Sequence, residues 1–353
     1  MNINAEHTPG RFRDVDRDNM WSLLFRFSDQ WREAMAICQT ASWNLDRSRI
    51  RNVLFAGMGG SAIGADLIRA YSLNSSPVPV FVNRNYRLPS WVDEQTLVVA
   101  CSFSGNTEET LSALDEAMER GAQVAAVTSG GKLLMKMSAE GRNYVKVPGG
   151  MPPRAALAYS FVPLFSLFSY LGFLKESDTV LEETAVLLEE QVRILSDTES
   201  SRAMDLARQI QDTMPIVYTG PELLDPVGTR WCCQFEENAK ILSYRNVVPE
   251  MNHNEIVGWE QVAHLTGRIS VILLEDREDH PKVLQRMQIL REMVEEKAVH
   301  VVRFNPTGNS RLARQFSLVQ LGDWVSFYLA MLNGVDPTPI TQIDLFKSRL
   351  AEF

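Results

Sequence analysis

The stretch Val98–Glu109, VVACSFSGNTEE, combines a strand, a turn and the start of a helix. Its apolar, β-branched beginning predicts a buried strand, and the acidic residues after Thr107 are typical of a first helical turn. The turn between them, SFSGNT, offers hydroxyl groups and backbone N–H groups at one place. Because the helix dipole adds positive charge there, the stretch predicts a phosphate-binding site.

Helix capping is an alternative explanation for part of this turn. Asn106 and Glu109 have the spacing of a capping box, in which two side chains satisfy the free N–H groups of a helix start. One cap needs one side chain, however, and this explanation leaves the hydroxyl groups of Ser102, Ser104 and Thr107 without a role.

A similar stretch, VLFAGMGGSAIG, lies upstream at Val53–Gly64. Two such turns in one α/β unit indicate a phosphorylated small molecule as the ligand. The segment Gly57–Ala62 also fits the GxGxxA dinucleotide fingerprint. A NAD site needs an acidic residue after the next strand, where this chain has Asn83 and Arg84. Arg84 keeps NADP binding open as an alternative.

The rest of the chain alternates between strand and helix patterns, which predicts parallel sheets covered by helices. We expect strands at 52–56, 78–82, 96–101, 123–128, 144–147, 216–220, 269–275 and 299–304. We expect helices at 14–45, 62–72, 107–120, 155–172, 179–213, 281–297, 311–332 and 342–351. The second unit repeats the first, because Gly220 follows its first strand as Gly57 does.

The Pro- and Gly-rich segment 148–154 is the expected domain boundary. The predicted fold class is therefore α/β, with two flavodoxin-like, three-layer subdomains that have parallel sheets. Residues 1–50 are expected to be an N-terminal helical segment, 51–150 the first subdomain, and 151–353 the second subdomain with linking and C-terminal helices.

The composition limits the classes of partner. The net charge of −9, from 35 basic and 44 acidic side chains, argues against nucleic acid or an anionic membrane as a partner. The polar first residues contain no secretory signal, and no apolar run approaches the roughly 18 residues of a membrane span. The four cysteines form no CxxC pair and His253 has no partner at ligand spacing. We therefore expect reduced thiols, no metal, no cofactor and a cytoplasmic location.

Three stretches carry polar residues in apolar surroundings. In PPRAALAYSF, Arg154 either stabilises an oxyanion or pairs with a carboxylate at a helix start. In WCCQFEENAKI, Glu236 and Glu237 differ by about 100° around a helix, so that one faces a cleft as a base or both are solvated. In PEMNHNEIVGW, His253 belongs either to a functional loop or to an ordinary surface or core position.

The motifs GMGGSAIG and SFSGNTEET resemble the sugar isomerase (SIS) domain, which binds phosphorylated sugars at these loops. The resemblance implies a phosphate-binding set and a substrate loop. These are Ser61, Ser102, Ser104 and Thr107 for the phosphate, with Gly59 and Gly60 in the loop.

From about Asn52 to Leu350 the chain also resembles the bifunctional phosphoglucose/phosphomannose isomerase family, above all in ENAK and NHNEIVGW. The resemblance implies that Glu237 is the base and that Arg154 stabilises a cis-enediolate. It further implies that His253 of the partner subunit and Lys347, in DLFKSRL, assist ring opening. The expected enzyme is a metal-independent homodimer with a shared active site, which interconverts glucose 6-phosphate, and mannose 6-phosphate, with fructose 6-phosphate.

Two other functions remain open at this point. A non-catalytic SIS-type regulator that binds sugar phosphates would need the phosphate turns but not Glu237, His253 and Arg154. An NADP-dependent oxidoreductase would bind a nucleotide at the first turn.

Overall fold

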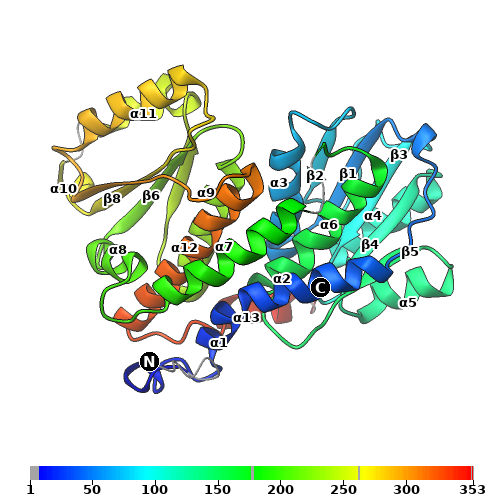
Figure 1. Cartoon of the computed structure of the whole chain (residues 1–353), viewed down its shortest axis with the longest axis horizontal. Coiled ribbons are helices and arrows are strands. Elements are labelled where there is room, and N and C mark those ends of the chain that lie inside the picture. Colours follow the sequence, from blue (N-terminus) through cyan, green and yellow to red (C-terminus); the bar gives the residue numbers. More distant parts are fainter. Residues whose placement is uncertain (1–7, 176–178, 261–262, 351, 353) are drawn as a thin grey trace.

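The computed structural model describes residues 8–175, 179–260, 263–350 and 352, and it contains two parallel sheets flanked by helices (Figure 1). The sheets lie side by side, with the helices α2, α6 and α7 crossing between them. The predicted α/β class with two parallel-sheet units is confirmed. Among the described residues, no helix is long and apolar enough to cross a membrane.

The first sheet has the strand order β2-β1-β3-β4-β5, the flavodoxin-like winding. Its elements are β1 (Asn52–Gly57), α3 (Gly59–Ser72), β2 (Val80–Asn83), β3 (Thr96–Cys101), α4 (Glu108–Glu119), β4 (Gln123–Thr128), α5 (Gly131–Ala139) and β5 (Asn143–Lys146). The sequence patterns did not indicate α5, which buries only Leu133 and Met137, one helical turn apart.

The second sheet has the order β7-β6-β8-β9 and so repeats the winding of the first four strands. Its elements are β6 (Met214–Thr219), α9 (Asp225–Ala239), β7 (Tyr244–Val247), β8 (Ile269–Leu274), α11 (Pro281–Val294) and β9 (His300–Phe304). The short helices η4 (Glu250–His253), η5 (Glu255–Trp259) and α10 (Ala263–Thr266) follow β7. Strand β7 was not predicted, because this four-residue edge strand carries polar side chains.

Further helices connect and cover the two sheets. They are η1 (Gly10–Phe12), α1 (Met20–Phe25), α2 (Phe27–Thr40), η2 (Arg47–Arg49), η3 (Pro153–Ala155), α6 (Leu157–Leu171), α7 (Thr179–Leu195), α8 (Arg202–Ile210), α12 (Arg311–Leu332) and α13 (Thr341–Leu350). The prediction of a single helix over 179–213 is wrong. It divides into α7 and α8, because Ser201 caps a new helix by accepting the Met204 N–H. Residue 351 of the expected last helix lies outside the described residues.

One apolar core joins the inner faces of both sheets. In β1, Val53 and Phe55 belong to this central core, whereas Leu54 and Ala56 face a separate outer core, because strand side chains alternate between faces. Val217 of β6 reaches the same central core from the other sheet. The two units therefore share a common apolar interior.

Candidate active site

Two turns meet at the carboxyl ends of β1 and β3, which are neighbours in the sheet. The Phe103 N–H donates to Ser61 Oγ at 2.9 Å and thereby ties the second turn to the first. Within the second turn, Ser102 Oγ and Thr107 Oγ1 lie 2.8 Å apart. In open parallel sheets this switch point in the winding is where ligands bind. The structure thus brings the predicted phosphate hydroxyls to one sheet edge, with Ser104 exposed in the same turn.

The capping-box alternative for this turn is wrong. The N-cap of α4 is Thr107, whose side chain makes no capping hydrogen bond. Asn106 instead accepts the Lys132 N–H at 3.1 Å and so connects the turn to α5. The first N–H groups of α4 are therefore not capped by either side chain, which suits an external anion.

The glycine loop packs directly against the segment that carries Arg154. A Cβ atom at Gly60 would lie 3.0 Å from the carbonyl carbon of Pro153 and 3.1 Å from the nitrogen of Arg154. Gly59 has a φ of +49°, a conformation that favours glycine. The missing side chain of Gly60 therefore allows the first turn and the Arg154 segment to approach one another.

Arg154 is 3% exposed and is held by four acceptors. Its Nε donates to Asn238 Oδ1 at 2.7 Å, and its Nη2 donates to the carbonyl oxygens of Pro337 at 2.6 Å and Thr338 at 2.9 Å. Its Nη1 lies 3.4 Å from Glu237 Oε2. Burial lowers the pKa of Arg154, and Glu237 opposes this shift. The guanidinium is thus fixed, with one side directed at Glu237.

The two neighbouring glutamates of α9 face different surroundings. The side chain of Glu237 is 26% exposed and contacts Arg154. Glu236 is exposed and accepts a hydrogen bond from Ser243 Oγ at 3.1 Å. Lys240 ends the helix and donates to the carbonyl oxygen of Glu237 and, at 3.3 Å, to that of Pro337. The helix therefore presents one carboxylate, Glu237, to the buried arginine.

His253 and Lys347 lie apart from this pair. His253 is exposed at the end of η4, and Lys347 is exposed on α13. Among the described residues, neither makes a hydrogen bond or ion pair with Arg154 or Glu237. Their roles at the site stay predictions.

Arg84, on which the NADP alternative depends, forms an ion pair with Asp66 of α3. The side chain of Asp66 is 12% exposed, so the arginine's charge is already balanced beside the first turn. The strand order also differs from the 3-2-1-4-5-6 order of a dinucleotide fold. Among the described residues, no three His, Cys, Asp or Glu side chains gather as metal ligands would.

The corresponding turn of the second unit is acidic. It reads EDREDH from Glu275 to His280, and the Glu275 N–H donates to Phe304 O at 3.1 Å, as the Ser102 N–H does to Val127 O at 3.2 Å. Asp279 lies against Gly220, where an added Cβ would be 2.5 Å from its Oδ1. Burial raises the pKa of Asp279 to about 6. This turn therefore carries carboxylates where the first unit carries hydroxyls.

Comparisons with known proteins agree with this duplicated architecture. Residues 48–171 match the family model of the SIS domain, and residues 199–350 match that of the bacterial phospho-glucose isomerase C-terminal SIS domain. The chain is 41% identical to a bifunctional phosphoglucose/phosphomannose isomerase of Caldicellulosiruptor bescii, over 94% of this chain and 99% of that protein. The chain belongs to the bifunctional phosphoglucose/phosphomannose isomerase family.

Another member of this isomerase family, from Aquifex aeolicus, is 36% identical over 86% of this chain and 92% of its own length. A solved structure of a glucose-6-phosphate isomerase-like protein from Thermus thermophilus shares the fold, with a TM-score of 0.61 and 20% identity. That match covers 94% of this chain and 96% of the other. The resemblance inferred from the sequence motifs is confirmed.

Several buried polar residues behind the site of this isomerase-family chain were not predicted. Arg230 donates to both carboxylate oxygens of Asp323, at 2.9 and 2.7 Å, and to the carbonyl oxygen of Arg154 at 2.8 Å. Gln234 donates to Asp323 at 2.9 Å, and Asn238 to Ser326 Oγ at 2.9 Å. A signal was present, because Arg230, Gln234 and Asn238 recur every four residues on one face of the helix.

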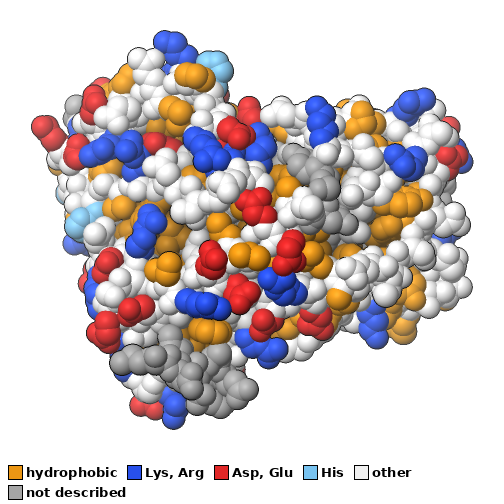
Figure 2. Space-filling view, viewed as in Figure 1, with side chains coloured by type: hydrophobic (Ala, Val, Ile, Leu, Met, Phe, Trp, Pro, Cys, Tyr) orange, Lys and Arg blue, Asp and Glu red, His pale blue; other side chains and the backbone are white. Residues whose placement is uncertain are grey.

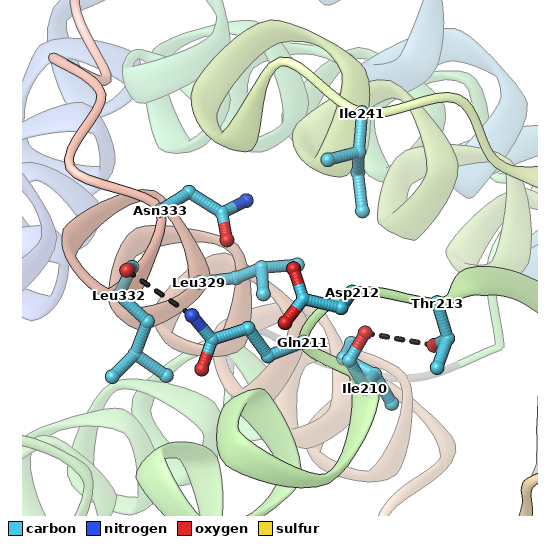
Figure 3. A pocket seen from close by; sticks show the side chains of 8 residues that line it. All are labelled: Ile210, Gln211, Asp212, Thr213, Ile241, Leu329, Leu332 and Asn333. Atoms are coloured by element: carbon cyan, nitrogen blue, oxygen red, sulfur yellow. Dashed lines mark hydrogen bonds between the residues drawn. The ribbon is translucent and has the colours of Figure 1, made fainter.

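A surface hollow of about 500 Å³ lies beside the segment that follows α9 (Figure 3). It is lined by Ile210, Gln211, Asp212, Thr213, Ile241, Leu329, Leu332 and Asn333. Gln211 and Asn333 already donate to carbonyl oxygens of the protein, at 3.2 and 3.4 Å. Neither the two turns nor Arg154 lines this hollow.

Figure 2 shows one face of the molecule, on which acidic and basic side chains are interspersed.

Proposed function

We propose that this chain is a phosphosugar isomerase that interconverts glucose 6-phosphate and mannose 6-phosphate with fructose 6-phosphate. The observation that carries the proposal is the contact between Arg154 and Glu237, directly beside the phosphate turns. The names of its relatives in the isomerase family support the same activity. In this arrangement the turns would hold the phosphate, and the opposite end of the sugar would lie at the Arg154–Glu237 pair.

In the proposed reaction, Glu237 takes the proton from C2 of the open aldose and returns it to C1. The proton of the C2 hydroxyl is transferred to the oxygen on C1, so that the carbonyl group moves from C1 to C2. The electron pair of the broken C–H bond forms the C1–C2 double bond, and negative charge develops on the carbonyl oxygen. Arg154, fixed before the substrate arrives, stabilises that charge without rearranging. Because C2 becomes planar, its original configuration is lost, so both epimers lead to the same ketose. The charge is balanced by the guanidinium, and the proposal therefore includes no metal.

Ring opening precedes the proton transfer, and we assign it to His253 of the partner subunit together with Lys347. The exposed position of His253 supports a role in a second copy. Helix α13 has no buried residue, and it exposes the apolar side chains of Ile343, Leu345, Phe346 and Leu350. Exposed apolar side chains on one helix support a contact with another chain. The proposed active unit is a homodimer with a shared site.

A regulator that only binds sugar phosphates is the second candidate. It would use Ser61, Ser102, Ser104 and Thr107, but it would gain nothing from a buried arginine held by four acceptors beside a carboxylate. The cost of burying such a charge favours the enzyme.

An isomerase assay in EDTA tests the proposal. The purified chain is given fructose 6-phosphate, and glucose 6-phosphate and mannose 6-phosphate are measured separately. We expect both products without added metal. Glucose 6-phosphate alone would contradict the dual specificity. Neither product, together with a rise in melting temperature on adding fructose 6-phosphate, would contradict catalysis and favour the regulator.

The exposed hydroxyl of Ser104 allows a test of phosphate binding. Ser104→Ala is expected to raise KM for fructose 6-phosphate about 10-fold and to change kcat little, because one hydrogen bond to a charged group is lost equally from substrate and transition state. Ser48→Ala, in the short helix η2 before the amino end of β1, is the control. A KM that stays unchanged in Ser104→Ala would remove this residue from the phosphate site.

A further inference from the structure

The segment that carries His253 contains little regular secondary structure. It consists of η4 and η5, two short 3-10 helices after the edge strand β7. Met251, just before His253, is fully buried in the outer core of the second unit. His253 itself is exposed. A second anchor is therefore needed on the other side of His253 if the imidazole is to keep one position.

Glu255, two residues after His253, provides such an anchor, because its carboxylate is hydrogen-bonded to side chains of two strands. One carboxylate oxygen accepts a hydrogen bond from Tyr218 Oη of β6, and the other accepts one from Asn246 Nδ2 of β7 at 2.5 Å. The Trp259 Nε1–H, at the far end of η5, donates to the same tyrosine oxygen at 3.2 Å. Both ends of η5 are thus connected to one buried hydroxyl.

The tyrosine at the centre of these contacts is 0% exposed. Burial raises its pKa, and the hydrogen bond to Glu255 acts in the same direction, so the hydroxyl stays protonated and donates. Trp259 is 6% exposed and packs in the same outer core as Met251. Removing the Glu255 carboxylate would leave a buried hydroxyl and a half-buried amide without their acceptor, and such unpaired groups are costly.

We propose that Glu255 is a positioning residue for His253, which it holds by fixing the backbone of η5 to β6 and β7. This inference rests on the proposed function, in which His253 assists ring opening. Two extended residues span no more than about 7 Å, so an anchor at Glu255 restricts where His253 can lie. Met251 fixes the backbone before the histidine and Glu255 fixes it after, so that the position of His253 is restricted from both sides.

A double-mutant cycle separates this role from general stability. In the otherwise unchanged chain, Glu255→Ala is expected to lower kcat/KM for fructose 6-phosphate about 10- to 100-fold, the usual effect of a misplaced catalytic group. In the His253→Ala background the same change is expected to cost less than about 3-fold, because the group that it positions is gone. Equal losses in both backgrounds, or no loss in either, would overturn the inference.

Two further variants complete the experiment. Glu255→Gln keeps an acceptor for Tyr218 and is expected to recover part of the activity, and it serves as the test variant if Glu255→Ala does not fold. Glu250→Ala is the matched control, because within the described chain the side chain of this exposed glutamate of η4 has a hydrogen bond only with Asn254 of the same segment. If His253→Ala alone has full activity, the proposed role of His253 fails, which is a different result from additive losses in the cycle.

Discussion

Glu237→Gln is expected to lower kcat for isomerisation by about 10²- to 10⁴-fold, the usual contribution of a general base. The amide keeps the size of the side chain and can still accept from Arg154, but it cannot take the C2 proton. Because the phosphate turns are untouched, we expect KM to change much less than kcat. Rates with glucose 6-phosphate and mannose 6-phosphate should fall together, since one base serves both epimers.

The adjacent residue provides a matched control for this prediction. Glu236→Gln changes the same chemical group one position away, on a side chain that is exposed and bonded to Ser243. We expect this variant to keep nearly all of the activity. If Glu236→Gln loses as much activity as Glu237→Gln, or if Glu237→Gln keeps more than a tenth of the activity, Glu237 is not the base.

Arg230→Leu is expected to lower the free energy of unfolding by about 3–5 kcal/mol, the cost of leaving one member of a buried ion pair alone. Arg230 is 3% exposed and Asp323 is 4% exposed. Burial raises the pKa of Asp323, and the arginine opposes that shift. Without the arginine, a carboxylate remains in the interior and the backbone carbonyl of Arg154 loses its donor. Urea unfolding followed by circular dichroism measures the change.

Two controls show whether the loss comes from an uncompensated buried charge. Arg193→Leu breaks an exposed pair with Glu189 on α7 and is expected to cost less than about 0.5 kcal/mol. Combining Arg230→Leu with Asp323→Leu removes both charges and is expected to restore much of the stability. A double variant that is less stable than Arg230→Leu would contradict this explanation.

The strand, turn and helix around Val98–Glu109 could be predicted because their signals are local. The apolar strand, the hydroxyl-rich turn and the helix start all lie within Val98–Glu109. The acceptors of Arg154 could not be predicted in the same way. Two of them are main-chain carbonyls at Pro337 and Thr338, more than 180 residues away, and a carbonyl has no sequence signature.

The same reasoning explains the missed elements of the second unit. The four-residue strand β7 depends on pairing with β6, so tertiary contacts decide it more than its own residues do. By contrast, the polar stripe Arg230–Gln234–Asn238 was visible as a helical repeat. The positions of His253 and Lys347 in the reaction stay predictions, because neither contacts the Arg154–Glu237 pair within the described chain.

The acidic turn from Glu275 to Asp279 makes the two units of this duplicated fold suited to different functions. Under the proposed function, a phosphate would be attracted to the hydroxyl turn of the first unit and repelled by the carboxylates of the second. Under the proposed function, one unit recognises the invariant end of every substrate. The other unit does not bind the phosphate, and it contributes Glu237 from the helix after its first strand. The proposed phosphate turns and the proposed base thus lie on different copies of the fold.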